Sequence, residues 1–110
     1  MPLETRKLEF TEAELQSALV GYALRRDIAL PQNNVEDVII GEGTNPNVTL
    51  VYDPNEPGDD EAVEFSGAQV AAALIVYCRS QRIPLPRDAQ KVLREENGGI
   101  AMIIRIQWNE

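Results

Sequence analysis

An internal repeat constrains the fold of this chain more than any other feature of its sequence. Aligned with itself at an offset of 55 residues, the chain has nine identities among the 24 positions that pair residues 8–31 with residues 63–86. The matched positions are mostly apolar, capping or turn positions, whereas the mismatches fall mostly on expected surface. Self-similarity at a fixed period is typical of repeated supersecondary units. The sequence therefore predicts two copies of one structural unit.

Each copy contains the pattern of a helix with one buried face. Thr11 and Ser66 are good N-cap residues, and three residues later Glu14 and Gln69 complete the pattern of a capping box. Apolar residues then recur at the spacing i, i+3, i+4, i+7. They are Leu15, Ala18, Leu19 and Tyr22 in the first copy and Val70, Ala73, Leu74 and Tyr77 in the second. The pattern predicts two helices of about 15 residues, which end before the Ile-x-Leu-Pro segment of each copy.

Segments that favour β-structure follow each predicted helix. Residues 35–40 and 48–52 are rich in apolar and β-branched side chains, and the Gly/Asn/Pro segment 41–47 between them favours a turn. Residues 89–95 and 100–108 stand in the same relation to the Asn-Gly-Gly segment 97–99, which is a strong turn signal. The sequence therefore predicts two hairpins.

The last strand and two short runs complete the predicted unit. Side chains alternate between the two sides of a strand, so the apolar positions of the last one are expected to share a buried side. They are Ile100, Met102, Ile104, Ile106 and Trp108. The runs 8–10 and 63–65, which precede the helices, are predicted edge strands. The predicted fold class is α+β: a tandem duplicated (β)αββ unit, with two helices packed on one face of an antiparallel sheet and pseudo-twofold symmetry.

Length and composition fit one soluble domain. A chain of 110 residues, with 44% apolar and 25% charged residues, buries a sufficient core without disulfides. The predicted domain, 1–110, contains repeat one at 8–52, an acidic connector at 53–62 and repeat two at 63–108. The longest apolar run, Val70–Cys78, is far shorter than the roughly 20 residues of a membrane-spanning helix. Since the N-terminus also lacks the pattern of a signal peptide, we expect a cytoplasmic protein.

The negative charge is concentrated in the connector. The net charge of −8 disfavours nucleic acid and anionic lipid as partners. Residues 53–64 contain six acids and no base, together with Pro and Gly residues that favour turns. Two interpretations stay open: a hydrated loop that keeps the protein soluble, or a negative patch for a basic partner. In the second case the candidate partner-binding residues are Asp53, Glu56, Asp59, Asp60 and Glu61.

Residue types that carry chemistry are few. The chain has no histidine, and its one cysteine, Cys78, lies among apolar neighbours of the second helix, where a thiol is expected to act as a small hydrophobe. Glu9 and Glu64 occupy equivalent positions, either as solvated strand residues or as a pair of carboxylates for acid/base chemistry. Tyr22 and Tyr77 are expected to anchor the core. No catalytic, cofactor-binding or metal-ligating residue is predicted.

The second helix is apolar on more than one side. Ala71, Ala72, Ile75 and Val76 add to its core stripe. Small residues on both helices would let them pack closely within one molecule, while a homodimer contact is the alternative use of the same surface.

Several features of the chain resemble small proteins common in bacteriophages and prophages. They are the Ala-Leu-x-x-Tyr cores at 18–22 and 73–77, the Arg-Ile-Pro-Leu-Pro segment 82–86, and the Gly-Gly hairpin at 98–99 before an alternating last strand. The resemblance covers both copies and implies a mobile-element origin, but it supplies no catalytic residues. Many known proteins of this size and acidity act by binding, including inhibitors of host defence systems.

These patterns predict a non-enzymatic binding or regulatory protein that engages a protein partner of host or phage, through a surface that includes the acidic connector. One alternative is a self-assembling structural subunit, joined through the second helix or an edge strand. Another is a small-molecule or enzymatic pocket that uses Glu9, Glu64, Tyr22 and Tyr77. No cofactor is expected, and neither nucleic acid nor membrane is an expected partner.

Overall fold

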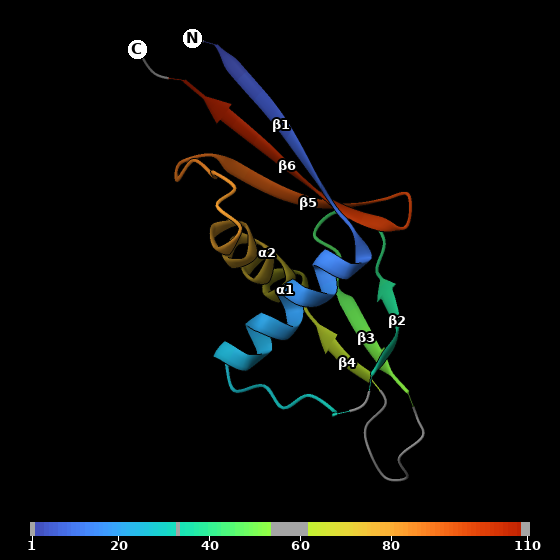
Figure 1. The fold of residues 1–110 in the computed structure, drawn as a ribbon. Helices are drawn as coiled ribbons and strands as arrows, with labels where there is room; N and C mark the ends of the chain where they lie inside the picture. Colours follow the sequence, from blue (N-terminus) through green and yellow to red (C-terminus); the bar gives the residue numbers. More distant parts are fainter. Residues whose placement is uncertain (1, 33, 54–61, 109–110) are drawn as a thin grey trace.

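The computed structural model describes residues 2–32, 34–53 and 62–108, and its elements follow the order β-α-β-β-β-α-β-β (Figure 1). The elements are β1 (Leu3–Phe10), α1 (Glu12–Arg25), β2 (Val35–Ile40), β3 (Val48–Tyr52), β4 (Ala62–Phe65), α2 (Gly67–Ser80), β5 (Gln90–Glu96) and β6 (Gly99–Gln107). The predicted helices, hairpins and edge strands are therefore confirmed. The predicted α+β class is confirmed with them.

Both helices begin at the predicted capping boxes. The Thr11 hydroxyl accepts the N–H of Glu14 at 3.1 Å, and the Glu14 carboxylate accepts the N–H of Thr11 at 2.9 Å. Ser66 and Gln69 make the same pair of bonds at 3.2 and 2.9 Å. These bonds satisfy backbone donors that the first helical turn leaves without intrahelical partners.

Both helices also end in the same way, just before the Ile-x-Leu-Pro segments, as predicted. Asp27 and Arg82, two residues beyond the ends of α1 and α2, have φ values of 55° and 59°. The N–H of Ile28 then bonds to the carbonyl of Ala23 at 2.9 Å, as the N–H of Ile83 does to that of Cys78 at 2.8 Å. A left-handed residue followed by such a bond is typical of a Schellman C-cap.

The strands form two three-stranded antiparallel sheets, so the prediction of a single sheet is wrong. Sheet A has the order β1-β6-β5, and sheet B has the order β2-β3-β4. Each sheet thus combines a hairpin with a strand from the other half of the chain (Figure 1). The sheets do not merge through β5 and β2 because the free edge of β5 is occupied by residues 43–45 of the β2–β3 turn, with an isolated bridge between Thr44 and Arg94.

Strand register is the same in the two sheets. In sheet A, Phe10 pairs with Ile100 and Leu8 with Met102. In sheet B, the residues 55 positions later, Phe65 and Val63, pair with Val48 and Leu50. The hairpins agree as well, because Leu93 pairs with Met102 in one sheet and Val38 with Leu50 in the other.

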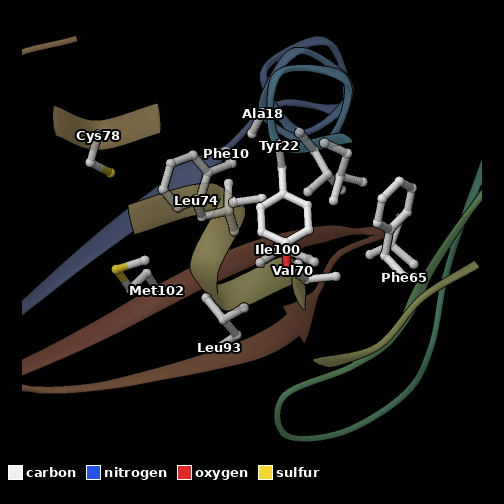
Figure 2. Packing of buried hydrophobic residues seen from close by; sticks show 14 of the residues in the cluster. Phe10, Ala18, Tyr22, Phe65, Val70, Leu74, Cys78, Leu93, Ile100 and Met102 are labelled. Atoms are coloured by element: carbon white, nitrogen blue, oxygen red, sulfur yellow. The ribbon is translucent and has the colours of Figure 1, made fainter. Parts of the chain in front are cut away.

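One hydrophobic core joins the helices to both sheets. The predicted apolar stripes are buried at Leu15, Ala18, Leu19, Tyr22, Val70, Ala73 and Leu74. Tyr77 is only half-buried and meets the ring of Phe10 edge-on, with centroids 6.5 Å apart. Figure 2 shows side chains of both helices, among them Ala18, Tyr22, Val70 and Leu74, gathered with Phe65, Leu93 and Met102 between the helices and the strands.

Trp108 departs from the predicted buried side of the last strand. Ile100, Met102, Ile104 and Ile106 are buried, but Trp108 is 46% exposed and follows the end of β6. β1 and β6 extend past the helices, toward the two chain ends in Figure 1, so no helix covers this position. The Trp108 indole instead donates to a carboxylate oxygen of Glu4 at 3.0 Å. The molecule is correspondingly long, with extents of 60 × 27 × 18 Å.

Candidate protein-binding surfaces

The predicted acidic binding residues are only partly described by the structure. Asp53 follows β3, is half-buried, and donates its N–H to the carbonyl of Asn34 at 3.0 Å, beside the start of β2. Glu56, Asp59, Asp60 and Glu61 lie outside the described residues. Their part in binding stays a prediction.

The acidic character extends well beyond the connector. Residues 27–78 contain ten acids and no lysine or arginine, a charge of −10. The rest of the chain contains the other eight acids and all ten bases, so its charge is 10 − 8 = +2. We call residues 27–78 the acidic half. This charge asymmetry can be counted from the sequence alone, but the prediction above considered only the charges of the connector.

Folding places the acidic half in sheet B and most of α2. The strands of sheet B carry Glu36, Asp37 and Glu64, all exposed, and no basic residue. Glu64 accepts a hydrogen bond from the side-chain amide of Asn47 at 2.8 Å. Sheet B therefore presents negative charge without a compensating cation on its own strands.

β2 forms one edge of sheet B and lies on the side of the molecule away from the helices (Figure 1). Gly41 donates its N–H to Asn47, toward β3. Because backbone groups alternate in direction along an antiparallel strand, Val38 and Ile40 direct theirs away from β3. The N–H of Val38 bonds to the carboxylate of Asp37 at 2.8 Å. The Val38 carbonyl and the N–H and carbonyl of Ile40 have no partner among the described residues.

The corresponding edge of sheet A is closed by the chain itself. There the N–H of Asn45 donates to the Leu93 carbonyl at 2.7 Å, and the N–H of Glu95 donates to the Gly43 carbonyl at 3.1 Å. The N–H of Leu93 bonds to the side-chain oxygen of Asn45 at 3.1 Å. An extended segment therefore occupies the edge of β5, whereas no segment among the described residues occupies the edge of β2.

The outer face of sheet A differs from sheet B in carrying cations as well as acids. Arg94 and Arg105 are exposed there and line a shallow hollow with Gln90, Val92 and Ile103. Lys7, on the same face, forms ion pairs with Glu9 and Glu96. Sheet A therefore carries both cations and acids on its strands, while the charged residues on the strands of sheet B are all acids.

The residues considered for catalysis are not brought into one site. Glu9 lies on β1 in sheet A beside Lys7, whereas Glu64 lies on β4 in sheet B beside Asn47. The hollow next to Glu9 is lined by residues of β1 and of the β5–β6 turn region and does not include Glu64. Among the described residues, no group of three or more Cys, Asp or Glu side chains has the arrangement of a metal site.

Cys78 and Tyr52 are two further candidate nucleophiles, and both are buried. Burial raises the pKa of the Cys78 thiol, with a smaller contribution from the charge of Glu14. Burial likewise raises the pKa of the Tyr52 hydroxyl. The thiolate is the reactive form of cysteine, so these shifts disfavour nucleophilic chemistry at Cys78.

Comparisons with known proteins return no match: no family model, no curated protein and no solved structure is similar to this chain. The resemblance to bacteriophage proteins therefore stays a prediction. In the part of the chain that the structure describes, none of the helices is both long and apolar enough to span a membrane.

Proposed function

We propose that this protein is a non-enzymatic binding module whose acidic half engages a positively charged protein partner. The carrying observation is the separation of charge, −10 over residues 27–78 against +2 over the rest. A surface of one sign attracts a partner of the other sign and speeds their encounter. The separate positions of Glu9 and Glu64, and the raised pKa of Cys78, favour binding over catalysis.

The duplicated (β)αββ unit with pseudo-twofold symmetry belongs to the same proposal. It is supported by the matched capping boxes at Thr11 and Ser66, the left-handed residues at Asp27 and Arg82, and the shared strand register. In such a duplication each unit would contribute its first strand to the hairpin of the other. One copy could then diverge in surface charge while the other kept the cations of sheet A.

Self-assembly is a second candidate, favoured by one observation. The outer face of sheet A exposes Arg94 and Arg105, and sheet B exposes acids, so one molecule offers both members of a complementary pair. Head-to-tail contact between such faces is heterologous and would build chains of molecules. Light scattering that detects only monomer at high concentration would rule this candidate out.

Affinity capture with matched charge variants tests the proposed function. The tagged protein is incubated with bacterial lysate, and bound proteins are eluted with increasing salt and identified by mass spectrometry. The test variant combines Asp59→Asn, Asp60→Asn and Glu61→Gln in the acidic half. The control combines Glu9→Gln, Glu12→Gln and Asp88→Asn, which remove the same charge elsewhere.

The test variant and the control have different expected affinities for the partner. A stoichiometric partner should elute from the wild type with salt, since screening weakens contacts between exposed charges. The test variant should bind that partner more weakly and with a flatter salt dependence, while the control should bind as the wild type does. Equal loss in both variants would show that total charge, not the acidic half, determines binding.

A further inference from the structure

We propose that the open edge of β2 is a docking site for an extended, basic segment of the partner, which adds to sheet B as a further antiparallel strand. This inference rests on the proposed binding function and assigns it a place and a geometry. β-strand addition combines main-chain hydrogen bonds, which supply affinity, with alternate side-chain contacts, which supply specificity.

The edge of β5 shows how such a segment fits. Residues 43–45 run antiparallel to β5 and make two main-chain bonds, to the carbonyl of Leu93 and from the N–H of Glu95. The residues 55 positions before Leu93 and Glu95 are Val38 and Ile40. The Val38 carbonyl and the Ile40 N–H have no described partner. An incoming strand can therefore donate an N–H to the Val38 carbonyl and accept a hydrogen bond from the Ile40 N–H.

The third polar group of each edge bonds to a side chain, which belongs to the added segment at β5 and to the edge strand itself at β2. The Leu93 N–H bonds to the side chain of Asn45, and the Val38 N–H bonds to the side chain of Asp37. β2 thus leaves open the two groups that β5 uses with its own added segment. The bulge between Val35 and Asp37 limits the regular edge to Asp37–Ile40, within which Val38–Ile40 matches residues 43–45 in length.

Side chains around this edge define the chemistry of the occupant. Ile39 is 53% exposed on the outer face of β2, where it can pack against an apolar side chain of the added strand. Glu36, Asp37 and Glu42 flank the edge, and sheet B carries no cation. A second copy that paired through its own β2 would bring acidic side chains against these carboxylates. Charge complementarity therefore favours a partner strand that carries lysine or arginine beside β-branched residues.

The test measures binding of a fluorescent peptide of alternating lysine and valine by anisotropy. Ile40→Pro removes the outward N–H without changing charge, and proline is tolerated where an edge N–H points to solvent. The matched control, Ala62→Pro, changes the opposite edge of the same sheet, where the register with Val51 directs the N–H outward. We expect Ile40→Pro to weaken binding about tenfold, because it removes one hydrogen bond and leaves a carbonyl of the peptide without a donor. Ala62→Pro should leave binding unchanged.

A second arm leaves the protein unaltered, in case Ile40→Pro does not fold. A peptide methylated on every backbone nitrogen keeps its charges but cannot donate to Val38, and we expect it to bind about tenfold more weakly than the plain peptide. Equal affinity of the two peptides, or of the wild type and a folded Ile40→Pro, would overturn the docking site.

The outcomes separate this inference from the proposed function. Binding that weakens with salt but ignores both backbone changes would retain the acidic half as a binding surface and reject the β2 edge. No binding at low salt would reject both. A dimer in light scattering that Ile40→Pro dissociates would assign the edge to a second copy and overturn the partner strand.

Discussion

Glu4 illustrates how single side chains replace packing where the core ends. Its carboxylate accepts from the guanidinium of Arg6 at 2.9 Å and from the indole of Trp108 at 3.0 Å. The hydrogen bond from Arg6, followed by that from Trp108, lowers the pKa of Glu4. The strands that extend past the helices are therefore joined by polar contacts between β1 and the residue after β6. Alternation along the last strand wrongly predicted a buried Trp108, because it could not reveal that the helices stop short of this residue.

The lowered pKa predicts how this contact responds to acid. A carboxylate whose folded pKa is below its unfolded value contributes stability above the unfolded pKa, and loses it as pH falls through the folded value. The Trp108 indole N–H resonance should therefore titrate with a midpoint below the usual range of glutamate. Arg6→Gln should raise the midpoint, because it removes the largest cause of the shift. A midpoint that Arg6→Gln leaves in place would contradict this assignment.

At the scale of elements, local patterns predicted more than pairings. Helix starts, hairpins and edge strands follow from short-range signals such as Thr11 with Glu14, or the Asn-Gly-Gly turn at 97–99. The partner of each first strand does not, since β1 pairs with β6 from the opposite end of the chain. The closure of β5 by residues 43–45 depends on the φ of 49° at Asn45, which no apolar periodicity encodes. Apolar periodicity likewise could not predict that the edge of β2 stays open.

Two glycines provide a matched test of how the β2–β3 turn meets α2. A Cβ at Gly67, the first residue of α2, would lie 2.2 Å from the Asn45 carbonyl oxygen, whereas one at Gly21 would meet only the end of the Arg25 side chain at 3.5 Å. Gly67→Ala should destabilise the fold by displacing the turn from β5. Gly21→Ala should stabilise it by about 0.5–1 kcal/mol, the usual helical preference for alanine. Thermal unfolding of both variants measures the contrast, and equal effects would contradict the close approach.

The whole molecule is interlocked, because each sheet takes strands from both halves of the chain. A piece that ends after β3 would retain β1, α1 and one hairpin, but β1 would lack β6. A two-stranded hairpin is only marginally stable without a further strand. The charge separation is already present in the sequence, because all three strands of sheet B lie within the acidic half.

Cleavage within the connector tests the interlock. Pieces 1–56 and 57–110 should each lack a stable monomeric fold, and mixing them in equal amounts should restore the circular dichroism and cooperative unfolding of the intact chain. The reason is that each piece supplies the strand that the hairpin of the other requires. Two pieces that fold separately as monomers would contradict the pairing of β1 with β6 and of β4 with β3.

The most direct test of the account is amide hydrogen exchange, measured by NMR with and without the lysine–valine peptide. In the free protein the Ile40 amide should exchange freely, while the Glu95 amide should be protected by its bond to Gly43. At saturating peptide, Ile40 should become protected as Glu95 already is. Protection of Ile40 in the free protein, or its continued free exchange when the peptide is bound, would contradict an open β2 edge that receives the partner.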